Sequence, residues 1–425
     1  MIVKSSIARS PTRSAASGLL ASAAVALSLA CSNAHAATTI EFVQWWAPEL
    51  PEGSFREIMD EFEAQNPDIE VELVSGPYSA IRDQIVVGAA TGTLSDVVGL
   101  DGAWVNDLAR QGAIASLDEL MNTNDFGREQ VADIIQVDGS SYMFPVASFV
   151  YPMFVNLDMV EQAGIEALPT NRTEFIEAAR ALTDASSNRY GWVLPLSLQS
   201  PNGIQNDVMS WVWASGDSMM ADGKPDLTND DVVETLKFIQ TMYDEGLISP
   251  GSFAKKEQDK VEEFVNGRVG MMVSTLAHIN MIRERNPDLN FTITDFPSKD
   301  GYEGPKGLPY ASWGIGVSES SEHKEEAWKL VSYLMSAEVN SRLVSIANAF
   351  PGNTQATPDF VVSDELFGKG FEIFKAGYLA NEFTGLPVAE ELMRLLDVEI
   401  QKMLEGDQTA EEAAANAQAK WQEKF

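Results

Sequence analysis

Residues 38–46, TTIEFVQWW, determine how we interpret the rest of the chain. Residues 40–43 are predicted to form a first buried strand of a parallel sheet, and Trp45 and Trp46 follow where that strand ends. In open α/β sheets, ligands bind beyond the carboxyl ends of the strands. An exposed indole at this position covers the apolar face of a ring-shaped ligand. We therefore expect an aromatic binding site at this end of the sheet.

The first 36 residues have the features of a secretory signal peptide. A basic segment precedes a short apolar run at residues 18–30, and residues 34–36, Ala-His-Ala, match a cleavage site. The run is too short to cross a bilayer, which takes about 20 residues. We predict a mature chain that starts at Ala37 and resides in the periplasm. The basic residues of this leader are Lys4, Arg9 and Arg13.

Cys31 leaves an alternative open. Residues 28–31, SLAC, resemble a bacterial lipobox, although Leu29 stands one place too late. We expect a secreted soluble form ahead of a lipid anchor through Cys31. Cleavage after Ala36 would leave a mature chain without cysteine, so its stability would come from its core.

Length and charge narrow the class of protein. Residues 37–425 are too many for one ordinary core, so two lobes are expected. The formal charge of the whole chain is −34, and loss of the leader's three basic residues makes it more negative still. Such acidity argues against nucleic acid and anionic membrane surfaces as partners, and its simplest role is solubility.

The first part of the chain alternates strand and helix. A helix is predicted to begin with a capping box at Ser54 and Glu57, and strands are predicted at residues 68–74 and 96–100. Another helix, at residues 104–110, follows. This βαβαβα order predicts an α/β fold with a parallel sheet.

Later segments suggest a second lobe and chain crossings between the lobes. The apolar run at 143–156 is predicted to pass from the first lobe into the second, and residues 291–296 to pass back. Residues 207–215 are predicted to be helical, and residues 269–273 and 313–317 to be short strands.

Several segments together resemble one family, the extracellular solute-binding proteins of carbohydrate ABC transporters of the maltose-binding type. The resemblance extends over nearly the whole mature chain. It rests on segments that include FVQWWAPE at 42–49, FEAQNPDIEVELV at 62–74, FVNGRVGMMVS at 264–274 and WGIGVSESSEHKEEAWKLVSYLMS at 313–336.

The resemblance implies a two-lobe periplasmic-binding-protein fold (type II) with a hinge near residues 147–150, 295–297 and after 350. It places residues 37–148 and 296–352 in lobe 1, and residues 149–295 and 353–425 in lobe 2. It further implies a monomer that closes on a mono- or oligosaccharide and delivers it to ABC permease subunits in the inner membrane. No cofactor or metal is expected.

Sugar binding needs aromatic rings for the apolar C–H faces, and carboxylates or amides for the hydroxyls. We expect at least one of Trp45 and Trp46 to line the cleft while the other packs in the core. Asp101 and Trp104 follow a central strand, although Asp101 has the alternative role of a helix cap. Tyr78 follows Pro77 after the second strand and is a further candidate.

The remaining candidates come from the crossings and the second lobe. The resemblance places Tyr151 at a crossing that faces the ligand, with hinge packing as the alternative. Trp211 and Trp213 cannot both face the cleft, because positions i and i+2 of a helix diverge. We expect one to pack inward and prefer Trp211 for the cleft. Thr275 lies where relatives often carry an aromatic residue, and Trp313 precedes Gly314, where backbone approaches a ligand closely.

Two rival functions differ in chemistry. An enzyme such as a glycoside hydrolase is disfavoured, because no segment sets two acids in an evident catalytic arrangement and no Gly-x-Ser-x-Gly motif occurs. The same fold binding a sugar phosphate, a uronate or a polyamine is the other rival. Arg82 and Arg172 are candidate partners for an anion, but no basic cluster marks the strand ends. We expect a neutral sugar, then an anionic sugar, then a polyamine.

Overall fold

The computed structural model describes residues 37–425, which form one compact unit. The signal peptide and Cys31 lie outside the described residues. Among residues 37–425, no helix combines the length and the apolar character that crossing a membrane requires.

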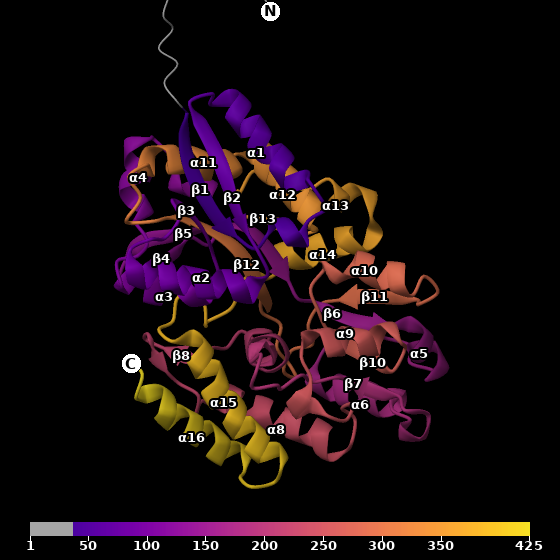
Figure 1. Cartoon of the computed structure of the whole chain (residues 1–425). Helices are drawn as coiled ribbons and strands as arrows, with labels where there is room; N and C mark the ends of the chain where they lie inside the picture. The colour runs from indigo at the N-terminus through magenta and orange to yellow at the C-terminus, as the bar shows by residue number, and fades with distance from the viewer. Residues whose placement is uncertain (1–36) are drawn as a thin grey trace, which may run out of the picture. The chain divides into compact units, whose positions relative to one another are not determined.

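An eight-stranded sheet within residues 37–425 forms the centre of the first lobe (Figure 1). The strand order is β13-β5-β12-β3-β1-β2, with β4 beside β5 and β14 beside β12. β1 runs parallel to β2 and β3, whereas β12 is antiparallel to β3 and β5. The strands are β1 (Thr38–Gln44), β2 (Ile69–Ser75), β3 (Val97–Leu100), β4 (Ile135–Val137), β5 (Ser140–Val150), β12 (Gly307–Val317), β13 (Phe350–Pro351) and β14 (Tyr378–Ala380).

Helices cover this sheet and bury an apolar core with it. Phe55, Ile58, Met59 and Phe62 of α1 are buried at helical spacing, as the sequence pattern indicated. The helices of this lobe are α1 (Ser54–Gln65), α2 (Tyr78–Thr91), α3 (Gly102–Arg110), α4 (Leu117–Thr123), α11 (Lys324–Leu334) and α12 (Ala337–Ala347). Short 3-10 turns are η1 (Ala47–Glu49) and η2 (Arg128–Gln130).

A four-stranded sheet of order β11-β6-β10-β7 forms the second lobe, beside a small β8-β9 hairpin. Its strands are β6 (Met153–Asn156), β7 (Tyr190–Trp192), β8 (Met220–Ala221), β9 (Lys224–Pro225), β10 (Val269–Val273) and β11 (Phe291–Thr294). Its helices are α5 (Leu157–Gln162), α6 (Arg172–Leu182), η3 (Ala185–Ser187), η4 (Ile204–Met209), α7 (Ser210–Trp213), α8 (Asp230–Asp244), η5 (Ser252–Ala254), α9 (Glu257–Val265), α10 (His278–Arg285), α13 (Phe360–Ser363), α14 (Glu365–Ala376), α15 (Ala389–Leu404) and α16 (Ala410–Gln422).

Three local predictions need correction. The capping box at the start of α1 does not form: Gly53 is the N-cap, and the Ser54 hydroxyl donates to the Pro51 carbonyl at 2.7 Å. The helix expected at 207–215 is a π-helix, η4, followed by the short α7. The strand expected at 313–317 is the last part of β12, which is 11 residues long. The exact lobe boundaries stay a prediction.

Candidate ligand-binding site

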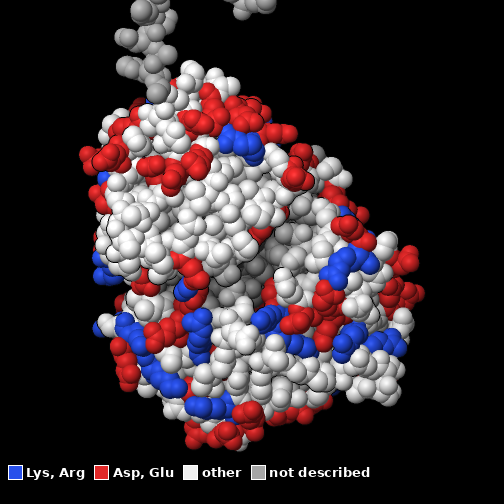
Figure 2. Space-filling view, viewed as in Figure 1, with Lys and Arg blue, Asp and Glu red and all other residues white. Residues whose placement is uncertain are grey.

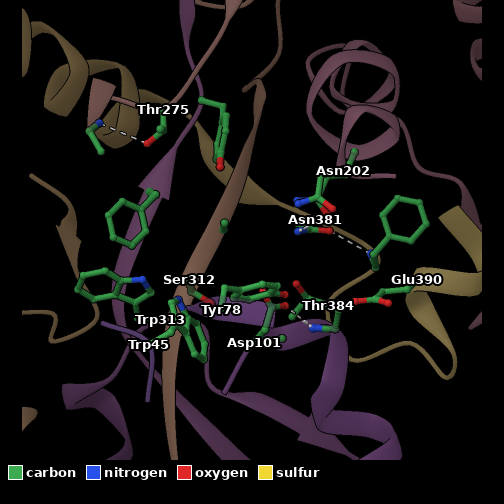
Figure 3. A pocket seen from close by; sticks show the side chains of 18 of the residues that line it. Trp45, Tyr78, Asp101, Asn202, Thr275, Ser312, Trp313, Asn381, Thr384 and Glu390 are labelled. Atoms are coloured by element: carbon green, nitrogen blue, oxygen red, sulfur yellow. Dashed lines mark hydrogen bonds between the residues drawn. The ribbon is translucent and has the colours of Figure 1, made fainter. Parts of the chain in front are cut away.

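A cavity of about 410 Å³ lies where segments of both lobes meet. Figure 2 shows the molecule hollowed between the upper and lower lobes, and Figure 3 shows the side chains that face the space. The lining residues come from segments far apart in the sequence. They are Trp45, Glu49, Tyr78, Asp101, Gly102, Ala103, Phe149, Tyr151, Asn202, Gln205, Thr275, Ala277, His278, Ala311, Ser312, Trp313, Asn381, Phe383, Thr384, Glu390 and Met393.

The ends of β1 and β3 supply one wall of the cavity. Trp45 follows β1 and meets the ring of Tyr78 edge-on, with centroids 5.2 Å apart. The Tyr78 hydroxyl donates to Asp101 Oδ2 at 3.1 Å, and the Ala103 N–H donates to Asp101 Oδ1 at 2.9 Å. Asp101 is therefore both the N-cap of α3 and a cavity residue, so its two expected roles coexist.

Gln44, the last residue of β1, fixes the turn beyond the strand. It is fully buried; its Oε1 accepts from the Ala47 N–H at 2.9 Å, and its Nε2 donates to the Ser75 hydroxyl at 2.6 Å. These bonds hold η1, which carries Glu49 into the lining. No local pattern in the sequence had indicated Glu49 as a site residue.

The crossing strands β5 and β12 form the floor. Trp313 packs against Phe149 with ring centroids 5.0 Å apart, and the Tyr151 N–H donates to the Pro309 carbonyl at 3.0 Å. The register of β12 shifts between Trp313 and Gly314. A β-carbon at Gly314 would lie 2.2 Å from Met143 Sδ, so a larger residue beside this irregularity would require the Met143 side chain to move.

Amides and hydroxyls from the second lobe face this floor. Gln205 belongs to η4, a π-helix, and such helices are frequent at functional sites. Asn381 Nδ2 donates to Gln205 Oε1 at 3.3 Å and to the Tyr310 carbonyl at 3.0 Å. The Ser274 hydroxyl and His278 Nδ1 are 2.8 Å apart, so His278 lines the cavity from the start of α10 beside Thr275.

Three predicted site residues do not line the cavity. Trp46 is fully buried in the first core, and its ring stacks against Trp313. Trp104 is also buried; it packs against Trp45 and faces a neighbouring groove instead. Trp211 is buried in the second core, with ring centroids 4.8 Å from Phe175, and Trp213 is buried as well, so the preference for Trp211 as a cleft residue does not hold. Residues 45, 78, 101, 151, 275 and 313 are all brought together.

The segment before α15 supplies lining residues that sequence reasoning missed. Asn381, Phe383 and Thr384 come from the irregular stretch between β14 and α15, and Glu390 lies in the first turn of α15. Its NEFTG motif at 381–385, which ends in Gly385 at φ +79°, is the local sign of a turn. Nothing local indicates that the turn faces the ligand cavity.

Several titratable side chains that line the cavity have shifted pKa values. Burial raises the pKa of Asp101, although hydrogen bonds from Ala103 and Tyr78 oppose the shift. Enclosure by the walls raises the pKa of Glu49 to about 7, against a hydrogen bond from Trp313 that lowers it. Burial lowers the pKa of His278, so the neutral imidazole is favoured. Among residues 37–425, no group of three or more His, Cys, Asp or Glu side chains is arranged to hold a metal ion.

Comparison with known proteins identifies the family. Residues 47–341 match the family model of the bacterial extracellular solute-binding proteins. The chain belongs to this family. This solute-binding protein is 28% identical over 353 residues to a putative binding protein of Brucella abortus (strain 2308), a match that covers 82% of this chain and 84% of that protein.

Solved structures share the fold of this solute-binding protein. The sugar-binding protein MalE of Xanthomonas citri superposes with a TM-score of 0.77 at 19% identity, covering 91% of this chain and 97% of that one. A solute-binding protein of Thermotoga lettingae TMO bound with α-D-tagatose gives a TM-score of 0.74 at 22% identity and covers 91% and 99%. The two-lobe type II fold is confirmed.

Proposed function

We propose that this protein is the periplasmic component of an ABC importer that captures a mono- or oligosaccharide in the cavity and delivers it to a membrane permease. The observation that carries the proposal is the set of aromatic rings at the cavity, Trp45, Tyr78, Tyr151 and Trp313, together with amides and carboxylates. Flat rings cover the C–H faces of a pyranose, and the polar groups bind its hydroxyls. The tagatose bound in the Thermotoga lettingae protein and the sugar-binding role of the Xanthomonas citri protein support this ligand class.

The mechanism that follows is capture and release without chemistry. A ligand that contacts both lobes stabilises their closed arrangement, and the permease recognises that form. Contacts between α3 and the segment before α15 join the two parts here: the Gly385 N–H donates to the Gly102 carbonyl at 3.0 Å, and Asn106 Nδ2 donates to the Gly385 carbonyl at 2.8 Å. A β-carbon at Gly102 would lie 2.6 Å from Thr384, so glycine permits this close approach.

The anionic alternatives have no support in the lining. Among the described residues, those that face the cavity include neither Lys nor Arg. Arg82 pairs with Glu390 at 3.0 Å on the rim of the neighbouring groove, and Arg172 donates to the Trp211 carbonyl at 2.8 Å in the second lobe. A sugar phosphate or uronate would therefore meet the carboxylates of Glu49 and Asp101, with no Lys or Arg among the lining residues to bind it.

Isothermal titration calorimetry against neutral mono- and disaccharides, uronates, sugar phosphates and spermidine tests the proposal. We expect a sugar to bind, and a concentration of 100 Kd to stabilise the protein by about 2.7 kcal/mol. Trp313→Ala should weaken binding at least tenfold. Phe425→Ala, which removes an exposed aromatic ring far along the chain from any lining residue, should not. Hydrolysis of an aryl glycoside, or binding of no sugar, would contradict the proposal.

A further inference from the structure

The carboxylates of the cavity differ in how their charges are balanced. Glu49, Asp101 and Glu390 all line it. Glu390 Oε2 accepts from Arg82 at 3.0 Å and from Arg394 at 3.4 Å, so its charge is compensated by two guanidinium groups. Within residues 37–425, neither Glu49 nor Asp101 has a Lys, Arg or His within ion-pairing distance. Asp101 accepts only from neutral donors, Tyr78 and Ala103.

Both uncompensated carboxylates act on the Tyr151 hydroxyl. After burial itself, the charges of Glu257, Asp101, Asp207 and Glu49 raise the pKa of the Tyr151 hydroxyl. Burial raises the pKa of Asp101, because partial removal from water disfavours a carboxylate that has no cation beside it. The pKa of Glu49 is raised as well, although this residue remains exposed to solvent. A positive group on the ligand would relieve this cost, whereas a neutral hydroxyl would relieve it only in part.

Aromatic faces surround the same wall. Figure 3 shows Asp101 beside Tyr78, Trp45 and Trp313, whereas Thr275 and Asn202 lie on the opposite side of the cavity. Trp45 and Tyr78 meet at an interplanar angle of 90°, so their rings present two differently oriented surfaces. An ammonium group near aromatic faces gains about 0.5–2 kcal/mol from the ring quadrupoles, and carboxylates add to that attraction.

The opposite wall is neutral. Gln205 is 8% exposed, and its Oε1 accepts from Asn381 while its Nε2 donates to no other described residue. This amide donor, with the Thr275 hydroxyl and the Asn202 amide, suits ligand hydroxyls and carries no charge. The cavity therefore has an anionic, aromatic side and a neutral, hydrogen-bonding side.

We propose that the ligand is an amino sugar whose protonated primary amine lies against Glu49 and Asp101, with its hydroxyls toward Gln205 and Thr275. This inference rests on the proposed sugar-binding function. It goes further by distinguishing cationic from neutral sugars, which share the same ring and differ only at one substituent.

Calorimetry at pH 7.5 with matched pairs of sugars tests the inference. The pairs are glucose and glucosamine, galactose and galactosamine, and cellobiose and the glucosamine dimer, with N-acetylglucosamine and spermidine as further probes. We expect the amine of at least one pair to bind tenfold or more tighter than its hydroxyl counterpart. N-acetylation should abolish that gain, because it removes the charge and keeps the ring.

Variants locate the amine. Glu49→Gln with Asp101→Asn should reduce the preference for the amine to less than threefold, and Glu49→Gln alone should reduce it in part. Glu52→Gln, which alters an exposed carboxylate three residues from Glu49 that does not line the cavity, should leave it unchanged. Circular dichroism checks that each variant folds.

The outcomes separate the two proposals. Equal or tighter binding of the neutral partner in every pair would overturn the amine inference and leave the sugar-binding function standing. Binding of spermidine alone, or of no compound in the panel, would overturn both. The comparison within the unaltered protein decides between these outcomes even where a variant fails to fold.

Discussion

The indole rings of Trp46 and Trp313 stack with their centroids 5.5 Å apart and their planes 9° from parallel. Trp313 lines the cavity, whereas Trp46 lies behind it and is fully buried against Phe42 and Phe55. Both indoles belong to the first apolar core, and Trp313, which is 5% exposed, is the one that also borders the cavity. Adjacent tryptophans in one sequence motif consequently have different roles.

This relationship predicts that Trp46→Ala is primarily a stability mutation. Loss of a buried indole should lower the free energy of unfolding by about 3–5 kcal/mol. The affinity for ligand should also fall, because Trp313 loses the surface that fixes its orientation. Trp211→Ala removes an equally buried indole from the second core and is the matched control. Urea unfolding should show similar losses for both, and titration under folded conditions should show an affinity loss for Trp46→Ala alone.

The hydrogen bond between Tyr78 and Asp101 predicts a selective effect on binding. Tyr78→Phe removes the hydroxyl that donates to Asp101 Oδ2 and leaves the ring against Trp45. Because Tyr78 is 36% exposed, stability should change by less than about 0.5 kcal/mol. Affinity should fall by about 0.5–1.5 kcal/mol as the carboxylate loses its orientation. Tyr243→Phe, which keeps a stacked ring outside the cavity, is the control, and an unchanged affinity for Tyr78→Phe would argue against this role.

The buried pair of Lys260 and Asp207 predicts strong non-additivity. Both side chains are fully buried, and Lys260 Nζ lies 2.9 Å from Asp207 Oδ2. Lys260→Met should destabilise the protein by about 3–5 kcal/mol, because it leaves the Asp207 carboxylate buried without its partner. The double variant with Asp207→Leu should recover part of that loss, because Glu257, whose Oε2 lies 2.8 Å from Lys260 Nζ, still lacks its cation. Additive losses in urea unfolding would show that the pair is not coupled.

Asp397 predicts a dependence of stability on pH. It is fully buried on α15; burial raises its pKa to about 7, although a hydrogen bond from Gln401 opposes the shift. The folded state binds the Asp397 proton more tightly than the unfolded chain does. The contribution of this proton to the free energy of unfolding is therefore fully present below about pH 4, and it is lost as the pH rises through about 7.

The change in the free energy of unfolding caused by Asp397→Asn should therefore depend on pH. It should be more stabilising at pH 8 than at pH 4, by roughly 2–4 kcal/mol. Chemical denaturation at both values measures the difference. Glu399, two residues away, is the contrasting control. Burial alone would raise the pKa of Glu399, but hydrogen bonds from Lys402, Lys420 and Gln408 outweigh burial and lower this pKa to about 2. Glu399→Gln should destabilise the protein at pH 8, and the same sign for both variants would contradict this interpretation.

The sequence allowed prediction of those site residues whose position follows from local pattern. Trp45 and Asp101 come directly after strands, so the direction of the sheet places them at the cavity. Whether Trp45 or Trp46 faces the ligand depends on η1, which is held by the long-range bond between Gln44 and Ser75. The hydrophobic periodicity of the sequence does not indicate which of the two tryptophans faces the ligand.

Other parts of the site depend on pairing between distant segments. Asn381 reaches the cavity because β14 pairs with the first residues of β12, more than 60 positions earlier in the chain. Trp211 was misassigned because one of two diverging indoles was expected to face the cleft, whereas Trp211 and Trp213 both pack into the second core. Both features come from tertiary structure, which one sequence does not reveal.

The insertion of β12 between β3 and β5 also constrains the order of assembly during synthesis. A growing polypeptide exposes two unpaired strand edges until residue 317 has emerged, by which time all strands of the second sheet are already made. Open edges of this kind invite association between chains. Early fragments should therefore need chaperone protection, and recombinant truncations that end before residue 317 should aggregate.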